Sequence, residues 1–180
     1  MSVSIRRAVP GDAEAWTDLH LVVWEEAYTG LMPPEVLTGR RSRRDEGVRK
    51  RRTMLESGAR VLLAEDDGHL VGFASAGPAR DEDPPAPVEL TAIYALASHH
   101  GTGLGRRLLE AALADAGVRP DDAVYLWVLE GNDRAIAFYA RHGFALDGVG
   151  EDEPEGRHLR MVRPARPVDG AARNTQEEQA

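Results

Sequence analysis

The sequence predicts an α/β (α+β) fold in which one mixed sheet is covered by helices. Apolar residues recur at helical spacing in some segments and alternate or run together in others, which is typical of strands. Glycine and proline separate these segments and give the order β-α-α-β-β-β-α-β-α-β-β. In a chain of 180 residues, this order indicates a single layered domain with its own core.

The first elements are a short strand and an amphipathic helix. Val3 and Ile5 alternate with polar neighbours, and Pro10 ends the strand. Asp12 is a residue type suited to cap a helix, and the residues over 13–28 that follow are apolar at helical spacing. We therefore expect a helix over 13–28 with one buried face.

A second helical region is expected over 35–55, interrupted near Gly39 and Gly47. This region concentrates positive charge, in Arg40, Arg41, Arg43, Arg44, Arg49, Lys50, Arg51 and Arg52. Two interpretations stay open: a solvated helix face, or a positive lip that attracts an anionic cofactor or substrate.

Turn signals define the remaining elements. An Asp-Asp-Gly turn between apolar runs predicts a hairpin, and further strands and helices alternate after it. The expected strands are 60–65, 70–76, 88–96, 123–129, 144–146 and 158–162, and the expected helices are 104–116 and about 132–142. The acidic segment 148–156 is predicted to be a loop. We expect 1–163 to form the domain and 164–180, which is rich in Pro, Ala, Gln and Glu, to be a disordered tail.

Composition excludes several classes of function. The net charge of -8 argues against a nucleic-acid partner, which would need clustered positive charge. No apolar run approaches the length of a membrane span, and the N-terminus has no signal-peptide core, so we expect a cytoplasmic protein without a membrane partner. With no cysteine, the chain has no disulfide, no thiolate metal site and no cysteine nucleophile.

The segment 88–105 carries the strongest functional pattern. A strand runs into a loop that holds Gly101, Gly103 and Gly105, and the loop opens directly into a helix. Glycine lets the backbone turn tightly, and the first turn of a helix offers free N–H groups at its positive end. With Arg106 beside it, this arrangement predicts an anion site suited to a pyrophosphate.

The glycine loop by itself leaves alternatives open. A dinucleotide-binding loop would place its third glycine one residue later, and a phosphate-binding Walker loop would have lysine where Arg106 follows Gly105. A tight strand-to-helix turn without a ligand also fits the spacing. A metal site at His99 and His100 is not expected, because adjacent residues rarely chelate one ion well.

Two motifs in the right order resemble the GNAT N-acetyltransferase family. The segment His100-Gly-Thr-Gly-Leu-Gly105 resembles the family's acetyl-CoA signature, although Gln or Arg is usual where His100 stands. The segment from Asn132 through Phe-Tyr to Gly-Phe144 resembles the family's second motif. The likeness covers about 3–163 and is most specific over 88–144.

The resemblance implies a GNAT fold with a mostly antiparallel central sheet, acetyl-CoA as the co-substrate, and no metal. The main chain of Ile93, Tyr94 and Ala95 should pair with the pantetheine arm like an added strand. A main-chain N–H near Ile93 or Tyr94 would polarise the thioester carbonyl. The remaining implied cofactor-binding residues are His100, Gly101, Thr102, Gly103, Leu104, Gly105, Arg106 and Asn132.

The implied reaction transfers acetyl directly to an amine, which requires a base for the amine and an acid for the departing thiolate. Tyr139 matches the family position that faces the thioester sulfur, so it is the expected acid. Glu89 is the candidate base, because by period two it shares a face with Thr91 and Ile93 in an apolar strand. The competing interpretations are a core tyrosine and a solvent-exposed glutamate.

The acceptor side is less defined. Trp24 and Tyr28 lie one helical turn apart and are expected to shape the substrate pocket, unless they only pack in the core. The acceptor is either a small-molecule amine or a protein N-terminus or lysine, and the acidic segment 148–156 favours a cationic one. A homodimer is expected only by analogy. The rival functions are a non-catalytic acyl-CoA-binding regulatory module and a nucleotide-binding enzyme.

Overall fold

The computed structural model describes residues 3–165, so the expected disordered tail lies outside the described residues from position 166 onward. The strands are β1 Ser4–Arg7, β2 Leu62–Asp66, β3 His69–Pro78, β4 Val88–Ala95, β5 Val124–Leu129, β6 Ala145–Glu153 and β7 Gly156–Arg163. The helices are α1 Ala13–Tyr28, α2 Pro34–Ser42, α3 Arg44–Glu56, α4 Leu104–Asp115 and α5 Asp133–Arg141, with 3-10 turns at Pro10–Asp12 and Ala97–His99. Within the described chain, no helix is both long and apolar enough to cross a membrane.

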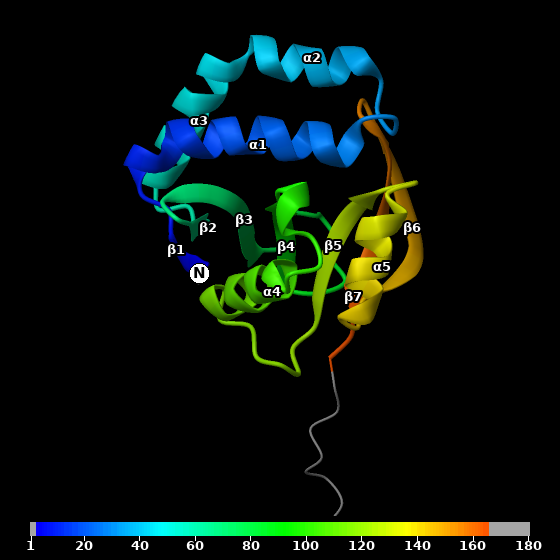
Figure 1. Ribbon diagram of the computed structural model, residues 1–180. Helices are drawn as coiled ribbons and strands as arrows, with labels where there is room; N and C mark the ends of the chain where they lie inside the picture. Colours follow the sequence, from blue (N-terminus) through cyan, green and yellow to red (C-terminus); the bar gives the residue numbers. More distant parts are fainter. Residues whose placement is uncertain (1–2, 166–180) are drawn as a thin grey trace, which may run out of the picture.

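The strands form one sheet in the order β1-β2-β3-β4-β5-β7-β6 (Figure 1). Every neighbouring pair is antiparallel except β4 and β5, which run parallel. The hairpin between β2 and β3 turns at Asp67 and Gly68, both with positive φ, as the Asp-Asp-Gly signal predicts. The predicted mixed, mostly antiparallel sheet flanked by helices is therefore confirmed.

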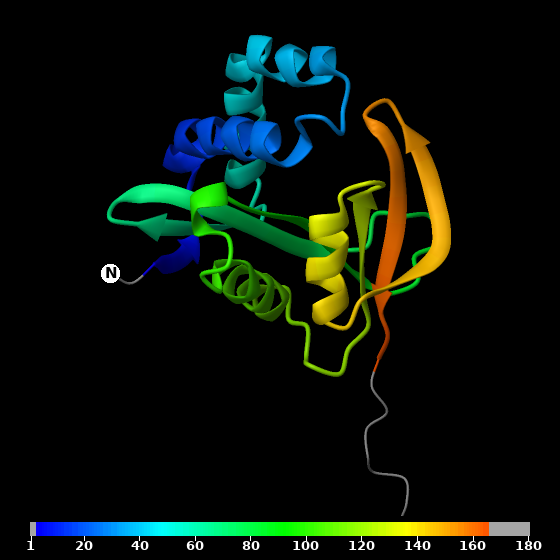
Figure 2. The same ribbon diagram turned by 45° about the vertical axis from the view of Figure 1, so that its right-hand side comes forward.

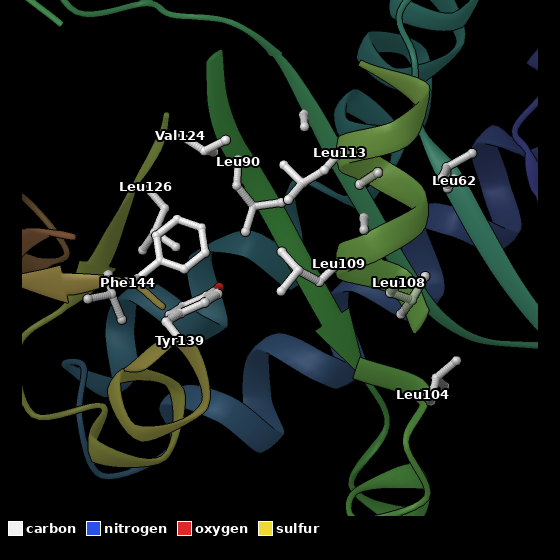
Figure 3. Close-up of a cluster of buried hydrophobic side chains, with 14 of the residues drawn as sticks. Leu62, Leu90, Leu104, Leu108, Leu109, Leu113, Val124, Leu126, Tyr139 and Phe144 are labelled. Atoms are coloured by element: carbon white, nitrogen blue, oxygen red, sulfur yellow. The ribbon is translucent and has the colours of Figure 1, made fainter. Parts of the chain in front are cut away.

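Helices cover the two faces of the sheet separately (Figures 1 and 2). Helix α1 packs on one face with Trp16, Leu19 and Val23 against Phe73 of β3. Helix α4 packs on the other face through its buried leucines, and Tyr139 and Phe144 extend that cluster toward β5 (Figure 3). The two cores explain why the central strands are apolar on both faces, because each face is covered.

The central feature is the separation of β4 from β5. Their only paired position is Glu89 with Tyr125, near the start of both strands. Beyond it, β4 from Ala92 to Ala95 stays bonded to β3, so its opposite edge carries unpaired backbone groups. An unpaired edge is a template for an extended ligand.

A bulge in β4 changes which side chains share a face. The pairing with β3 skips Thr91, since Ala76 faces Leu90 and Ser75 faces Ala92. As a result, Leu90 and Ile93 pack in the α4 core, while Ala92 and Tyr94 pack against the α1 side. The expectation from strict alternation that Glu89 shares a face with Ile93 is therefore wrong.

Three local predictions need correction. The second helical region divides at Arg43, while Gly39 and Gly47 lie inside helices. The side chain of Asp12 does not cap α1; it binds the Val9 amide and Arg6 within the preceding turn. The acidic segment 148–156 is mostly strand, because β6 continues to Glu153 and forms a long hairpin with β7.

Candidate functional site

Two clefts meet at the separated part of β4. The first, of about 560 Å³, lies on the β5 side and is lined by β4, the glycine loop, α5 and the end of α1. The second, of about 1040 Å³, lies between the sheet and helices α1 to α3. Thr91, Ala92 and Tyr94 line both clefts, so a group placed beside these residues is accessible from either side.

The glycine loop presents a row of amides that have no protein partner. Gly101 and Gly103 have φ values of +78° and +87°, which residues with a Cβ rarely adopt, and Gly103 is the N-cap of α4. Within the described chain, none of the amides from Gly101 to Arg106 donates a hydrogen bond; the first bond of α4 comes from Arg107 to the Gly103 carbonyl. Together with the positive end of α4, these N–H groups suit an anion.

Close packing of α5 brings a second helix to the same cleft. A Cβ on Gly105 would lie 3.2 Å from Cε2 of Phe138, so the absence of a side chain there lets α4 and α5 approach. Asn132 caps α5 by accepting a hydrogen bond from the Ala135 amide at 3.2 Å. The cleft also receives the cationic side chains of Arg106, Arg134 and Arg141.

The two histidines of the loop point to different partners. Nε2 of His100 lies 3.1 Å from the Ala95 carbonyl, and its ring contacts Arg134. Nε2 of His99 lies 3.2 Å from Asp66. His100 therefore fixes the end of β4 against the loop, at the position where the family pattern has Gln or Arg.

Tyr139 lies on α5 with its ring against Phe138 and Phe144, and its hydroxyl points away from α5 toward β4 (Figure 3). The residue is buried, yet it lines the first cleft, and its hydroxyl has no hydrogen-bond partner in the described chain. Burial, and then the nearby phenol of Tyr94, raise the pKa of Tyr139. Its hydroxyl therefore stays protonated at neutral pH and is available as a donor.

Three aromatic side chains, Trp24, Tyr28 and Tyr94, pack together where the two clefts meet. The hydroxyl of Tyr94 accepts a hydrogen bond from Trp24 Nε1 at 3.2 Å and lies 2.9 Å from the Tyr28 hydroxyl. Burial raises the pKa of both Tyr28 and Tyr94, so both phenols are neutral. The sequence indicates only a main-chain role for Tyr94; its side-chain role depends on the bulge, which no local pattern reveals.

Glu89 lies at the junction of β4 and β5, and only 1% of its surface is exposed to solvent. Arg80 binds both of its carboxylate oxygens, at 2.8 Å and 2.5 Å, and the Tyr125 hydroxyl lies 3.4 Å away. Glu89 does not line either cleft, whereas Arg80 lines the second. Sequence reasoning missed Arg80 because it lies in an irregular loop.

The structure brings most of the predicted residues to the first cleft. Those that line it are Tyr28, Ile93, Tyr94, Ala95, His100, Gly101, Gly103, Gly105, Arg106, Asn132 and Tyr139. The Thr102 hydroxyl donates a hydrogen bond to the His99 carbonyl, and the Leu104 side chain is buried in the core that α4 forms with the sheet. Each of these two residues can therefore contribute only its amide. Trp24 lines the second cleft.

Comparison with known proteins agrees with this fold. The profile of the acetyltransferase (GNAT) family matches residues 15–144. A protein of Mycobacterium tuberculosis named as a probable N-acetyltransferase is 29% identical over 150 residues, which is 82% of each chain. The solved PaiA N-acetyltransferase of Thermoplasma acidophilum, in complex with coenzyme A, superposes with a TM-score of 0.67 at 21% identity, covering 91% of this chain and 99% of that one. An acetyltransferase of Salmonella typhimurium, solved with its cofactor acetyl-CoA, gives 0.61 at 19% identity, covering 94% and 99%.

Proposed function

Since the chain belongs to the GNAT family of acetyltransferases, we propose that it transfers acetyl from acetyl-CoA directly to an amine in a ternary complex. The observation that carries the proposal is the row of unbonded amides from Gly101 to Arg106, facing the cleft at which β4 and β5 separate. A pyrophosphate bound by those amides leaves the pantetheine arm to follow the free edge of β4. The thioester then lies beside Tyr94, where the two clefts meet.

The reaction needs few groups from the protein. The amine nitrogen attacks the thioester carbon, an amide near Ile93 or Tyr94 stabilises the oxyanion, and the carbon–sulfur bond breaks. The Tyr139 hydroxyl donates its proton to the departing thiolate. The raised pKa of Tyr139 keeps that proton in place at neutral pH.

For Glu89 the contacts favour a positioning role over direct proton acceptance. Its bidentate bond to Arg80 occupies the oxygens that a base would use. We assign Glu89 to holding Arg80 at the second cleft, and we assign deprotonation of the amine to solvent in that cleft. If Glu89 is instead the base, Glu89→Gln will lower kcat by the factor of about 10² to 10⁴ that such a group contributes; a positioning role predicts a much smaller loss of kcat.

Two measurements test the function. Calorimetry with acetyl-CoA and with CoA should give saturable binding of one ligand per chain, lost when the glycine loop is altered. A panel of amines assayed by thiol release should then identify at least one acceptor whose turnover depends on Tyr139. A chain that binds neither acetyl-CoA nor CoA would refute the proposal, and binding without turnover of any amine would identify a non-catalytic acyl-CoA-binding module.

A further inference from the structure

The second cleft is strongly cationic. Its charged lining residues are Arg40, Arg43, Arg44, Lys50, Arg51, Arg60 and Arg80, opposed by Glu46 and Glu155. Some of these cations are neutralised within the chain: Arg44 binds Asp18, and Arg80 binds Glu89. Within residues 3–165, no carboxylate lies within ion-pair distance of Arg43, Lys50, Arg51 or Arg60.

Arg51 has the least favourable surroundings of this group. Its guanidinium contacts His20, lies 4.8 Å from the centroid of the Trp16 ring, and reaches the Thr17 hydroxyl only at 3.5 Å. Its Nε is buried and has no hydrogen-bond partner. Arg51 is half-buried, and a cation partly withdrawn from water without a counter-ion is costly, so such an arrangement is expected where a ligand supplies the negative charge.

The neighbours of Arg51 supply no negative charge. Burial, then the positive charges of Arg51 and Arg40, lower the pKa of His20 to about 3, so its ring is neutral. Burial, and then Arg40, lower the pKa of Arg51 itself to about 10, which still leaves it protonated at neutral pH. Arg51 therefore has neutral direct partners and a second cation, Arg40, in the same cleft.

Arg40 lines the same cleft. Its guanidinium carbon lies 3.4 Å from the centroid of the Trp24 ring, and its Nη2 lies 3.3 Å from a Glu155 carboxylate oxygen. This pair connects α2 to the turn of the β6–β7 hairpin, whose curved end rises beside the helices in Figure 2. The acidic Glu151, Asp152 and Glu153 do not line the cleft, so they give no support to a cationic acceptor.

We propose that the acceptor is a small amine that also carries a carboxylate or phosphate group, and that Arg51 binds this anion while the amine reaches the thioester beside Tyr94. The inference rests on the proposed acetyl transfer, and it reverses the preference for a cationic acceptor that the acidic segment indicates. Arg51 is a specificity-determining residue in this scheme, because it contacts the acceptor and not the reacting atoms.

The test pairs acceptors that differ only in the anion. The wild-type chain is assayed by thiol release with an amino acid, its amide and the corresponding amine without the carboxyl group, and with O-phosphoethanolamine against ethanolamine and spermidine. We expect kcat/KM at least about tenfold higher for an anionic member, and the two series separate carboxylate from phosphate recognition. Equal values across each pair, or a preference for spermidine, would overturn the inference and leave acetyl transfer standing.

Variants then assign the effect to one side chain. Arg51→Gln should raise KM for the anionic acceptor at least about tenfold and leave the Kd of CoA unchanged, and Arg51→Lys should restore part of the loss. Arg49→Gln removes the same charge from an exposed position of the same helix outside the cleft and should change nothing. Identical kinetics for the two glutamine variants would contradict a role of Arg51.

A binding measurement keeps the inference independent of turnover. Calorimetry of the anionic amine into the CoA-loaded chain should show binding that Arg51→Gln removes. Such binding without acetylation of any amine in the panel would support the anion site and refute the transferase proposal. Absence of binding by every anionic amine would refute the anion site, and the transferase proposal would then be decided by turnover of the other amines.

Discussion

The two clefts that meet at β4 are built in different ways. The first cleft, which we call the coenzyme cleft because we propose that CoA binds there, presents main-chain groups: the amides from Gly101 to Arg106 and the free edge of β4. The second cleft, which we call the acceptor cleft because we propose that the acceptor binds there, presents side chains from α1, α2, α3 and an irregular loop. Main-chain groups depend on local backbone conformation, whereas the side chains of the acceptor cleft depend on how distant elements pack. The coenzyme cleft should therefore be sensitive to backbone changes, and the acceptor cleft to changes of charge.

The largest effect is expected for Gly103→Val. A β-branched residue at φ +87° is strongly strained, and relief of that strain turns amides away from the ligand. Loss of two charge-assisted hydrogen bonds costs about 3–6 kcal/mol, so we expect the Kd of CoA to rise about 10³-fold. Calorimetry measures the change. Gly11→Val, at a position without positive φ and with open space around it, is the control.

A smaller effect is expected for Tyr139→Phe. Loss of a general acid typically costs about 10² to 10⁴-fold, and because thiolates leave readily we expect about 10²-fold in kcat. The Kd of CoA should stay within about twofold, because phenylalanine keeps the ring and its contacts with Phe138 and Phe144. A loss that appears in CoA affinity and not in kcat would contradict the assignment.

The pH dependence of the wild type sharpens the same point. Because the pKa of Tyr139 lies above its ordinary value of about 10, the acid stays protonated as the pH rises. The pH profile of kcat should therefore show no falling limb below about pH 10. A falling limb near pH 8 that Tyr139→Phe removes would show that the tyrosine is ionised too early to act in this way.

The Arg80–Glu89 pair ties a side chain of the second cleft to the junction of β4 and β5. Arg80→Gln leaves the Glu89 carboxylate buried without its cation, and we expect a loss of about 1–3 kcal/mol in the free energy of unfolding, because the exposed Arg80 side chain is partly screened by solvent. Denaturant unfolding measures it. The double variant Arg80→Gln, Glu89→Gln should recover part of the loss, and equal losses for the single and double variants would argue against a coupled pair.

The smallest expected effect is at the start of α5. Asn132→Ala removes the acceptor for the Ala135 amide and should cost about 1 kcal/mol, or roughly 2–4 °C in Tm. Asn132→Asp keeps the cap and should stay near the wild type. If Asn132→Ala also raises the Kd of CoA, the residue contacts the ligand as well as capping α5.

These differences also explain which parts of the site could be predicted. The sequence alone determines the coenzyme side: alternation and turn residues give the strands, and the glycine spacing before α4 places free amides where they are found. Tyr139 follows from the resemblance to the family's second motif, and because α5 is short and regular, sequence spacing fixes its position relative to Asn132. The hairpin at Asp67-Gly68 is determined in the same way.

Only the tertiary structure decides the acceptor side. The bulge at Thr91 reverses the faces of β4, places Tyr94 against Trp24 and Tyr28, and moves Glu89 away from the face of Ile93. Arg51 and Arg80 acquire their surroundings from residues far apart in the chain, such as His20 and Glu89. Such contacts arise from packing between separate elements. The local preferences that determine a loop or a helix end therefore do not predict them.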